Sequence, residues 1–358
     1  MPKATVLFVC TEKESYPRNN QIVNSLRDNF EVIKITSDKS SYPLRIIEVV
    51  TRLAASSLFK NYSLVFAGFL GQPLVMIIRF FIKKPLILDA FVSVYDALCL
   101  DREDFKPDSF VGRMAYHLDE LSFRLADTII TDTRSNADFF SKLFKTKRRK
   151  FYTLYVGTDE NIFYPREAKI NNDKCIVFFH GTFWSLHGIE YIIKAAKLLE
   201  DNTDILFRLL GGGREKRKIM KLTKELNLKN VEFIDWVSYQ NLSCRIAESD
   251  ICLGGHFSNN EKAKRVISGK TIQYLAMKKP VIAADCPAAK ELFTHAENIY
   301  LCAMADEKSL AKAIIELKGN AALRDKLARS GFELFKNRLS AQQSRNRLNE
   351  IIRDNHKR

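Results

Sequence analysis

The stretch EKAKRVISGKTIQYLAMKKPVIAA, residues 261–284, combines a basic loop, a short helix and a buried strand in direct succession. The helix is predicted over residues 271–277, where apolar side chains recur on one face. Pro280 ends it, because proline cannot continue the helical hydrogen bonding, and the apolar residues 281–284 then form a strand. A helix that leads directly into an apolar strand is the repeating unit of an α/β sheet.

The loop and the start of this helix carry four cationic side chains, namely Lys262, Lys264, Arg265 and Lys270. The free N–H groups and the positive dipole end of a helix N-terminus favour an anion at the same place. The alternative is a solvated basic loop without a ligand. The strand that follows favours the anion site, because ligands of open α/β sheets gather at strand ends beside helix N-termini.

The chain has 358 residues, which is enough for two domains of ordinary size. A polar segment at 161–173 predicts the linker, so we expect one domain at 1–165 and a second at 173–340. The net charge of +15 divides into 23 minus 19 up to Pro165 and 34 minus 23 after it. Such a charge suits nucleic acid, an acidic membrane surface or phosphorylated small molecules, and the scattered basic residues favour the last two.

The seven cysteines are scattered and form no C-x-x-C pair, so neither a disulfide framework nor a zinc site is expected. Several fall inside apolar strands, as is typical of small core residues in a reducing compartment. The first residues lack the pattern of a signal peptide, and the apolar run 74–82 is too short to span a bilayer. The sequence therefore predicts a cytoplasmic protein.

Apolar strands alternate with amphipathic helices along both halves of the chain, which predicts an α/β fold with two Rossmann-like, doubly wound parallel sheets. In the first half the predicted strands are 5–10, 31–36, 63–67, 85–88, 127–131 and 151–156. In the second half they are 175–180, 205–210, 231–234, 250–253, 281–284 and 298–301. Functional residues of such sheets belong at the carboxyl ends of the strands.

Two carboxylates follow the fourth predicted strand of the first half. Asp89 comes directly after the buried strand, and Asp96 lies in the loop beyond it. A buried carboxylate is costly unless it is paired or takes part in chemistry. Asp89 is therefore either a catalytic residue or a partner that holds the neighbouring loop. Asp96 is either catalytic or one half of a loop ion pair with Arg102.

Glycines follow three strands of the second half, at Gly181, at 211–213 and at 254–255. Tight turns alone explain any one of these sites. Because all three lie at carboxyl ends of one predicted sheet, they converge on a rim where a nucleotide diphosphate fits. The segment SGKT at 268–271 imitates the end of a P-loop, but Lys264 stands where the first glycine is required, so an NTPase is not expected.

Two segments of the first half combine basic and apolar or aromatic residues. Residues 74–84 form an apolar run with a basic end, and residues 139–152 interleave Lys and Arg with Phe and Tyr. Such mixtures bind anionic lipid headgroups and can also bind RNA. The alternative is a solvated helix end above an aromatic core. Peripheral membrane contact through both segments is therefore a secondary hypothesis, and a nucleic-acid-binding protein is a third, supported by charge alone.

Five segments of the second half follow one another in order: HGIEYIIKAAKLL after the Gly181 loop, RLLGGGREKRKI, VEFIDWVSYQNL, ESDICL and GKTIQYLAMKKPVIAADCPAAKEL. This set resembles the family-4 (group 1) retaining glycosyltransferases of the GT-B fold. The resemblance implies a nucleotide-sugar donor on 173–340, a glycan or lipid-linked acceptor on 1–165, and a reaction in the cleft between them. It also implies that a final helix, 341–358, packs back toward the first domain.

The resemblance further implies retention of configuration, a role in polysaccharide biosynthesis at the inner face of the membrane, and neither a metal ion nor a cofactor. In this fold cationic side chains and a helix dipole neutralise the leaving diphosphate. We expect Asp89 and Asp96 to act in catalysis. The expected donor-binding residues are Gly181, Thr182, His187, Gly212, Arg214, Trp236, Val237, Lys264, Arg265, Lys270, Thr271 and Gln273.

This chain departs from the family pattern at three places, one of which is Phe91, at about the position of the frequent histidine of the first domain. The usual pair of glutamates falls on Arg265 and Gln273, and the usual Arg and Lys after the first strand of the second domain fall on Thr182 and His187. We expect Lys264, Arg265 and Lys270 to take over phosphate binding and Gln273 to bond the ribose or the sugar. A catalytically inactive GT-B subunit that serves as a binding partner is the alternative. Trp236 either cradles the base or packs in the core.

Overall fold

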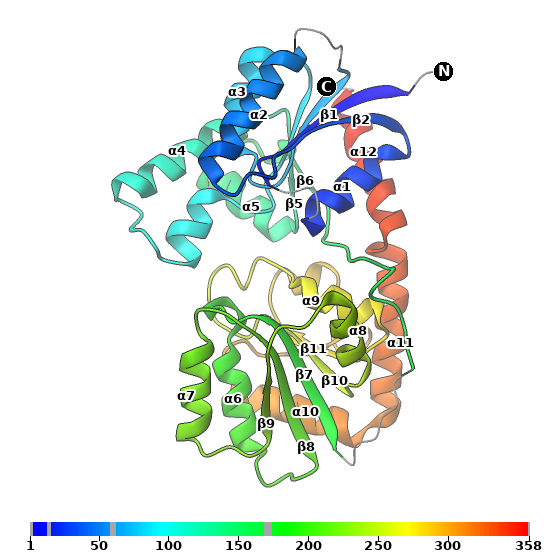
Figure 1. Cartoon of the computed structure of the whole chain (residues 1–358). Helices are drawn as coiled ribbons and strands as arrows, with labels where there is room; N and C mark the ends of the chain where they lie inside the picture. The colour runs from blue at the N-terminus through cyan, green and yellow to red at the C-terminus, as the bar shows by residue number, and fades with distance from the viewer. Residues whose placement is uncertain (1–2, 13–15, 58–61, 168–173, 357–358) are drawn as a thin grey trace. The chain divides into compact units, whose positions relative to one another are not determined.

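The computed structural model describes residues 3–12, 16–57, 62–167 and 174–356 (Figure 1). The chain divides into two compact units. Unit 1 comprises Met1–Gly157 together with Ala341–Arg358, and unit 2 comprises Thr158–Ser340. The predicted linker, 161–173, begins inside unit 2, and its residues 168–173 lie outside the described part of the chain.

Unit 1 contains, within its described residues, a six-stranded sheet of order β2-β1-β3-β4-β5-β6 with every neighbouring pair parallel. The central strands form where short apolar runs can be buried on both faces, as parallel sheets require. The strands are β1 (Ala4–Val9), β2 (Phe30–Ile35), β3 (Leu64–Ala67), β4 (Leu86–Asp89), β5 (Thr128–Thr131) and β6 (Phe151–Thr153).

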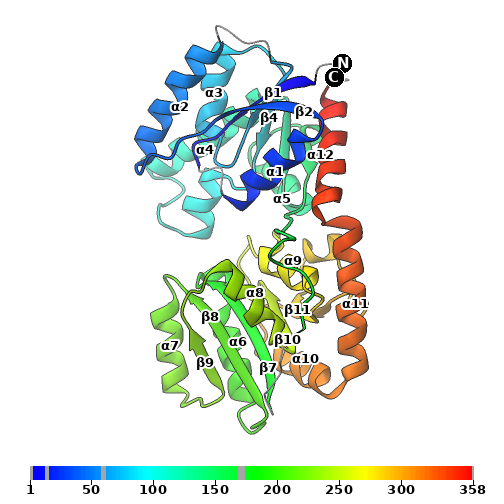
Figure 2. The same ribbon diagram turned by 45° about the vertical axis from the view of Figure 1, so that its right-hand side comes forward.

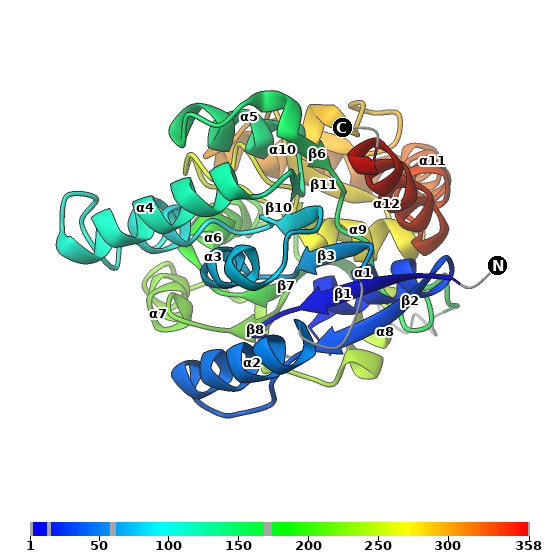
Figure 3. The same cartoon turned by 90° about the horizontal axis from the view of Figure 1, so that it is seen from above.

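The α-helices of unit 1 are α1 (Pro17–Arg27), α2 (Tyr42–Ser57), α3 (Gln72–Phe81), α4 (Phe110–Leu125), α5 (Arg134–Leu143) and α12 (Ala341–His356). A π-helix, η1 (Asp96–Asp101), and a 3₁₀ turn, η2 (Arg148–Lys150), complete it. Seen from above, α2, α3 and α4 follow one another along one side of the sheet (Figure 3), and neighbouring members of this row pack together.

The last helix belongs to the core of unit 1. Leu348, Ile351 and Ile352 of α12 are buried in one cluster with Val6 and Ile22. The packing of α12 against α1 is completed by a hydrogen bond from Gln21 Nε2 to Ser344 Oγ at 2.9 Å. Two segments from opposite ends of the chain therefore cover the same face of this sheet.

Unit 2 contains, among its described residues, a second six-stranded parallel sheet of order β12-β11-β10-β7-β8-β9. The strand order reverses between β7 and β10, and that reversal marks the point where open α/β sheets bind ligands. The strands are β7 (Cys175–Thr182), β8 (Ile205–Gly212), β9 (Val231–Ile234), β10 (Ile251–Gly255), β11 (Val281–Ala284) and β12 (Tyr300–Cys302).

Helices cover both faces of this sheet (Figure 2). On one face, α6 packs against α7 and α10, and on the other α9 packs against α11, with α8 beside it. The α-helices are α6 (Ile189–Leu198), α7 (Lys216–Glu225), α8 (Tyr239–Ala247), α9 (Gly269–Ala276), α10 (Glu307–Gly319) and α11 (Ala321–Arg338). Two 3₁₀ turns, η3 (Ser185–His187) and η4 (Ala289–Glu291), precede α6 and follow β11.

The predicted fold class, α/β with two doubly wound parallel sheets, is confirmed. The sequence pattern does not predict α4, because most of the buried positions of that helix are small or polar. These are Gly112, Ala115, Asp119 and Ser122, with Phe123 as the one large apolar side chain among the buried residues of α4, whereas Phe110 is exposed. Apolar residues therefore do not recur regularly on the buried face of this helix.

No helix in the described part of the chain is both long enough and apolar enough to cross a bilayer. In the same residues, no group of three or more His, Cys, Asp and Glu side chains is placed to hold a metal ion.

Candidate functional site

The basic stretch 262–270 forms the loop before α9 and the first turn of that helix. Ser268 is the N-cap residue, in an extended conformation, so α9 begins at Gly269, two residues before the predicted start. The hydroxyl of Ser268 does not cap the helix; it accepts a hydrogen bond from Lys270 Nζ at 2.9 Å. Lys270 is thereby turned inward, and only 6% of it is exposed.

Lys270 lies among aromatic and imidazole rings. Its Nζ is 3.3 Å from His187 Nδ1 and 4.9 Å from the centre of the Phe179 ring, where it makes a cation–π contact. His187 Nδ1 is in turn 2.9 Å from Nδ1 of His256. Within the described residues no carboxylate pairs with Lys270. A buried cation without an acidic partner is costly, and such a group is typical of an anion-binding site.

Burial governs the charge of this cluster. It lowers the pKa of Lys270 to about 7, since the charged ammonium is removed from water. Burial, followed by the nearby Lys270, also lowers the pKa of His187 and of His256 well below the usual range. Both imidazoles are therefore neutral at pH 7, and a bound anion would stabilise the charged form of Lys270.

The ends of β7 and β8 bring backbone close to the ammonium group. Gly181 has φ +146°, and a Cβ added to it would lie 3.1 Å from Lys270 Cε and 3.9 Å from His187 Nε2. A Cβ on Gly211, which has φ +128°, would lie 2.2 Å from the carbonyl oxygen of Gly181. Side chains at both positions are excluded, and the space beside Lys270 at the switch point of the sheet is kept narrow.

Trp236 lies on the surface just after β9, with 57% of its area exposed. Its indole Nε1 would be 3.6 Å from a Cβ on Gly212, and Gly212 pairs in register with Thr182 of β7. Core packing, one of the two predicted alternatives for Trp236, is therefore wrong. An exposed ring beside a glycine at the same strand ends can stack on a planar base. Val237, the next residue, is half-buried.

The other predicted phosphate-binding cations have protein partners. Lys264 Nζ is 2.6 Å from the Glu261 carboxylate, and Arg265 Nε donates to the Glu261 carbonyl at 3.2 Å although the residue is buried. Arg214 is exposed in the turn after β8. The structure thus separates Lys270 from cations that sequence alone places in one group.

Two polar atoms of α9 are buried without a hydrogen-bond partner. They are Thr271 Oγ1, which packs so closely on β10 that a Cβ on Gly254 would lie 2.4 Å from it, and Oε1 of Gln273. Both residues belong to the predicted donor-binding set. Buried polar atoms are usually satisfied, so two such atoms in one short helix are unusual.

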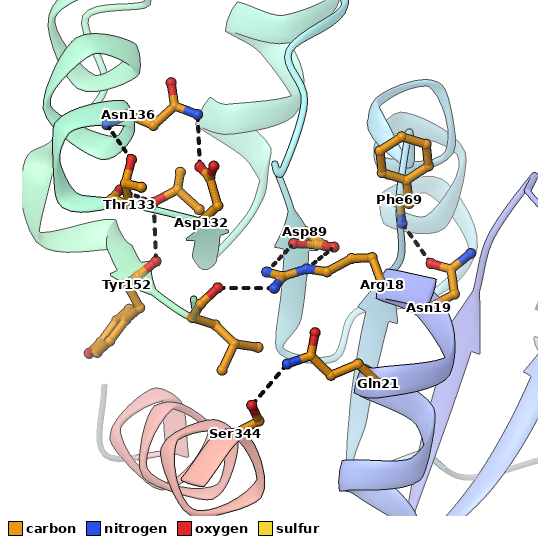
Figure 4. Close-up of polar contacts among 12 residues, drawn as sticks. Arg18, Asn19, Gln21, Phe69, Asp89, Asp132, Thr133, Asn136, Tyr152 and Ser344 are labelled. Atoms are coloured by element: carbon orange, nitrogen blue, oxygen red, sulfur yellow. Dashed lines mark hydrogen bonds and ion pairs between the residues drawn. The ribbon is translucent and has the colours of Figure 1, made fainter. Parts of the chain in front are cut away.

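In unit 1, Asp89 at the end of β4 is fully buried and forms a two-point ion pair with Arg18 of α1 (Figure 4). Arg18 Nε lies 3.1 Å from one carboxylate oxygen and an Arg18 terminal nitrogen 3.0 Å from the other. Another terminal nitrogen donates to the Leu154 carbonyl at 2.9 Å. Asp89 therefore has the structural pairing that the sequence left open, and this geometry lends no support to a catalytic role.

Asp96, the first residue of η1, is also buried. No sequence pattern indicates Asp119, which comes from the unpredicted helix α4. Asp119 accepts hydrogen bonds from Ser93 Oγ at 2.6 Å and from the Tyr95 amide at 2.8 Å. Burial raises the pKa of Asp119 to about 7. Its contacts fix the turn that leads into η1.

His256 is a second site residue that was not predicted from the sequence. It follows the glycine pair 254–255 directly, so the third glycine site was the available signal. The imidazole is buried and reaches His187, which follows β7. The two histidines follow β7 and β10, the two strands that flank the reversal of strand order.

Comparisons with known proteins agree with this organisation. The sequence profile described as "Glycosyl transferases group 1" matches residues 161–334. An uncharacterized glycosyltransferase of Haemophilus influenzae is 24% identical over 251 residues, which are 66% of this chain and 67% of that protein. The lipopolysaccharide core biosynthesis glycosyltransferase LpsD of Rhizobium meliloti is 28% identical over 169 residues, 47% of this chain and 46% of LpsD. The matched regions thus span from about half to two thirds of these relatives.

Among solved structures, HepE of Anabaena in complex with UDP superimposes with a TM-score of 0.76. The match covers 98% of this chain and all of HepE at 16% identity, which shows a common fold. Both units of the chain therefore have the architecture of GT-B glycosyltransferases. Residues 161–334, a little under half of the chain, match the sequence profile of the group 1 glycosyltransferases.

Proposed function

We propose that this chain is a group 1 glycosyltransferase, which moves a sugar from a nucleotide-diphosphate sugar held by unit 2 to a glycan or lipid-linked acceptor held by unit 1. The reaction proceeds with retention of configuration and without a metal ion or cofactor. The observation that carries the proposal is the buried Lys270, which has no acidic partner in the described structure and lies at the switch point of the unit 2 sheet.

The chemistry needs charge stabilisation on the leaving group. When the bond between the anomeric carbon and the diphosphate breaks, negative charge develops on the phosphate oxygen. Lys270 and the N-terminus of α9 are placed to stabilise that charge. The acceptor hydroxyl forms the new bond to the anomeric carbon, and its proton passes to the departing diphosphate. A preorganised ammonium group supplies the electrostatic stabilisation that a divalent cation provides in other enzymes.

The relatives support the substrate classes. HepE has been solved with UDP and with UDP-glucose, which supports a nucleotide-diphosphate sugar as the donor. LpsD acts in lipopolysaccharide core biosynthesis, as its name states, which supports a lipid-linked glycan as the acceptor. Trp236 is the residue we assign to the base, and Gln273 and Thr271 to hydroxyl groups of the donor.

Calorimetry with UDP, GDP and ADP and with their sugars tests the donor site. Lys270→Ala should reduce affinity by at least about tenfold, since a hydrogen bond to a charged group contributes about 1.5–3 kcal/mol. Lys279→Ala is the matched control, because Lys279 follows the same helix and its Nζ donates to the Ala247 and Ser249 carbonyls. The control should lose stability but keep its affinity.

Failure of the folded protein to bind any of these nucleotides would overturn the donor site. Equal affinities for the Lys270 and Lys279 variants would overturn the role of Lys270. Release or transfer of the sugar by the same samples separates an active enzyme from the catalytically inactive subunit, which binds the nucleotide without turnover.

A second proposal concerns the surface of unit 1 where α3 and α4 end. Arg79 of α3 pairs with Asp127 and donates to the Leu125 carbonyl, while Lys150 Nζ donates to the carbonyls of Arg124 and Ala126. These bonds bring the predicted membrane segments 74–84 and 139–152 to one place, beside the end of α4.

The side chains around this junction are mostly basic and partly aromatic. Phe80 is 82% exposed. The exposed or half-buried cations are Lys83, Lys84, Arg124, Lys147 and Arg149. Exposed aromatic rings among cations complement an anionic lipid surface. We assign this surface to peripheral contact with the inner face of the cell membrane, where a lipid-linked acceptor is carried.

Sedimentation with vesicles tests the surface. The protein should bind vesicles containing phosphatidylglycerol and not those of phosphatidylcholine alone. Lys83→Ala/Lys84→Ala should weaken binding, whereas Lys308→Ala/Lys312→Ala, two exposed lysines of α10, should leave it unchanged. Binding that is equal for both double variants, or that prefers RNA over anionic vesicles, would overturn the assignment.

A further inference from the structure

The contact between His187 and His256 defines the protonation of both rings. The two ring planes lie within 17° of each other with centroids 4.8 Å apart, whereas the two Nδ1 atoms are only 2.9 Å apart. Since the nitrogens are much closer than the ring centres, the imidazoles meet edge to edge through Nδ1. A hydrogen bond at this distance requires one N–H and one lone pair.

Lys270 decides which ring donates. Its ammonium group can only donate hydrogen bonds, and it lies 3.3 Å from His187 Nδ1. An N–H at His187 Nδ1 would point its positive end at this cation. When Lys270 is charged, as it is with an anion bound, His187 Nδ1 must therefore carry the lone pair, and His256 Nδ1 carries the proton that it donates to His187.

This assignment places the single proton of the neutral His187 ring on Nε2. Within the described residues, Nε2 of His187 has no protein partner. It lies 3.9 Å from the position that a Cβ on Gly181 would occupy, beside the Nζ of Lys270, which lies 3.5 Å from the same position. The Nε2–H group and the ammonium thus border the same narrow space at the end of β7.

We propose that His256 is a positioning residue that locks His187 in its Nε2–H tautomer, so that His187 donates a hydrogen bond to the diphosphate bound by Lys270. The inference rests on the proposed donor site. A neutral imidazole adds a donor without adding a second buried positive charge beside Lys270. Without His256, the ring of His187 can turn or change its tautomer and present a lone pair to the phosphate, which repels it.

The surroundings of His187 fit this role. The charged or titratable groups that face it are Lys270, His256 and His180, and burial together with Lys270 keeps the ring neutral. The Phe179 ring packs against it with centroids 5.9 Å apart. The backbone of η3 is also tied down, since the His187 carbonyl accepts a hydrogen bond from the Phe257 amide at 3.1 Å. His187 is thus held from both its ring and its backbone.

Histidine nitrogen NMR of the wild-type protein tests the tautomer directly. The chain has six histidines, and His187→Gln and His256→Asn variants assign the two signals. The expected spectrum shows His187 protonated on Nε2 and His256 protonated on Nδ1. A proton on Nδ1 of His187 with intact nucleotide binding would overturn the inference and leave the donor site standing.

Calorimetry with UDP, GDP, ADP and pyrophosphate tests the consequence. His256→Asn keeps an N–H donor near the position of Nδ1 and should bind within about twofold of wild type. His256→Leu removes the donor at similar volume and should lose about tenfold in affinity. Equal loss in both variants, or none in either, would overturn the positioning role. A wild-type protein with the expected tautomer that binds none of these anions would instead overturn the donor site, and with it the ligand assigned to His187.

Discussion

Arg18 of unit 1 and Lys270 of unit 2 are both buried cations at the carboxyl ends of parallel strands, with 3% and 6% of their area exposed. They differ in what surrounds them. Arg18 is matched by the Asp89 carboxylate and the Leu154 carbonyl, whereas Lys270 meets a hydroxyl, a neutral imidazole and an aromatic ring. A buried cation with a carboxylate partner stabilises the fold, whereas a buried cation without one is suited to bind an anionic ligand.

The largest expected effect comes from removing Asp89, the ion-pair partner of Arg18. Asp89→Ala leaves the guanidinium group buried without a counter-charge, so the free energy of unfolding should fall by about 3–5 kcal/mol. Urea denaturation followed by circular dichroism measures this loss. Asp138→Ala, which breaks an exposed pair with Arg148, is the control and should change it by less than about 1 kcal/mol. Nucleotide affinity of the folded Asp89 variant should stay unchanged; a loss confined to turnover would restore its predicted catalytic role.

In unit 2, removing the buried cation should change the free energy of unfolding in the opposite direction. Lys270→Met replaces an unmatched buried ammonium by an apolar chain of similar length, so the ligand-free protein should gain on the order of 1–2 kcal/mol of stability. Thermal denaturation with and without nucleotide measures both parts of the effect. The wild type should be stabilised by the nucleotide and the variant should not. Destabilisation of the ligand-free variant would show that Lys270 is a structural cation like Arg18.

A smaller effect concerns pH. Lys270 binds an anion in its charged form, and its pKa in the ligand-free protein is about 7. Affinity for a nucleotide sugar should therefore fall as pH rises above about 7, by up to about tenfold per pH unit. The free energy of unfolding depends on pH in the opposite direction. Between pH 7 and 10.5 the unfolded chain binds more protons at Lys270 than the folded protein does, so the contribution of Lys270 to stability rises with pH. Calorimetry from pH 6 to 9 tests the first statement, with the flat profile of Lys270→Met as the control.

The smallest effect on stability is expected at Trp236. Stacking on a base contributes about 1–3 kcal/mol, so Trp236→Ala should weaken nucleotide binding while stability changes by less than about 0.5 kcal/mol at this exposed position. Pyrophosphate affinity should be unaffected. Tyr239→Ala removes another exposed aromatic ring, one that packs on Phe163, and should leave nucleotide affinity unchanged. An equal loss for pyrophosphate in the Trp236 variant would contradict its assignment to the base.

The sheets could be predicted from sequence because their central strands are short apolar runs separated by turn residues, and β9 and β11 match their predicted bounds. The helix α4 could not, because most of its buried positions other than Phe123 are small or polar, while Phe110 is exposed. Local periodicity reports burial only when the buried face is the apolar one.

The location of the candidate site could be predicted from the sequence better than the residues that form it. Glycines after β7, β8 and β10 indicate the rim, since chain order and strand ends are readable from sequence. The different environments of Lys264 and Lys270 were not readable, because they depend on which side chain the first turn of α9 directs inward. The pairing of Arg18 with Asp89 and the contact of His187 with His256 join residues far apart in the sequence, and no local pattern encodes them.

The placement of α12 has a consequence for how the protein is made. Residues 158–340 form one continuous unit, whereas unit 1 needs both the beginning and the end of the chain. A ribosome delivers Val6 and Ile22 before residues 158–340, and their core neighbours Leu348, Ile351 and Ile352 after them. All residues of unit 2 are therefore made before α12, and one face of the unit 1 sheet stays uncovered until α12 follows.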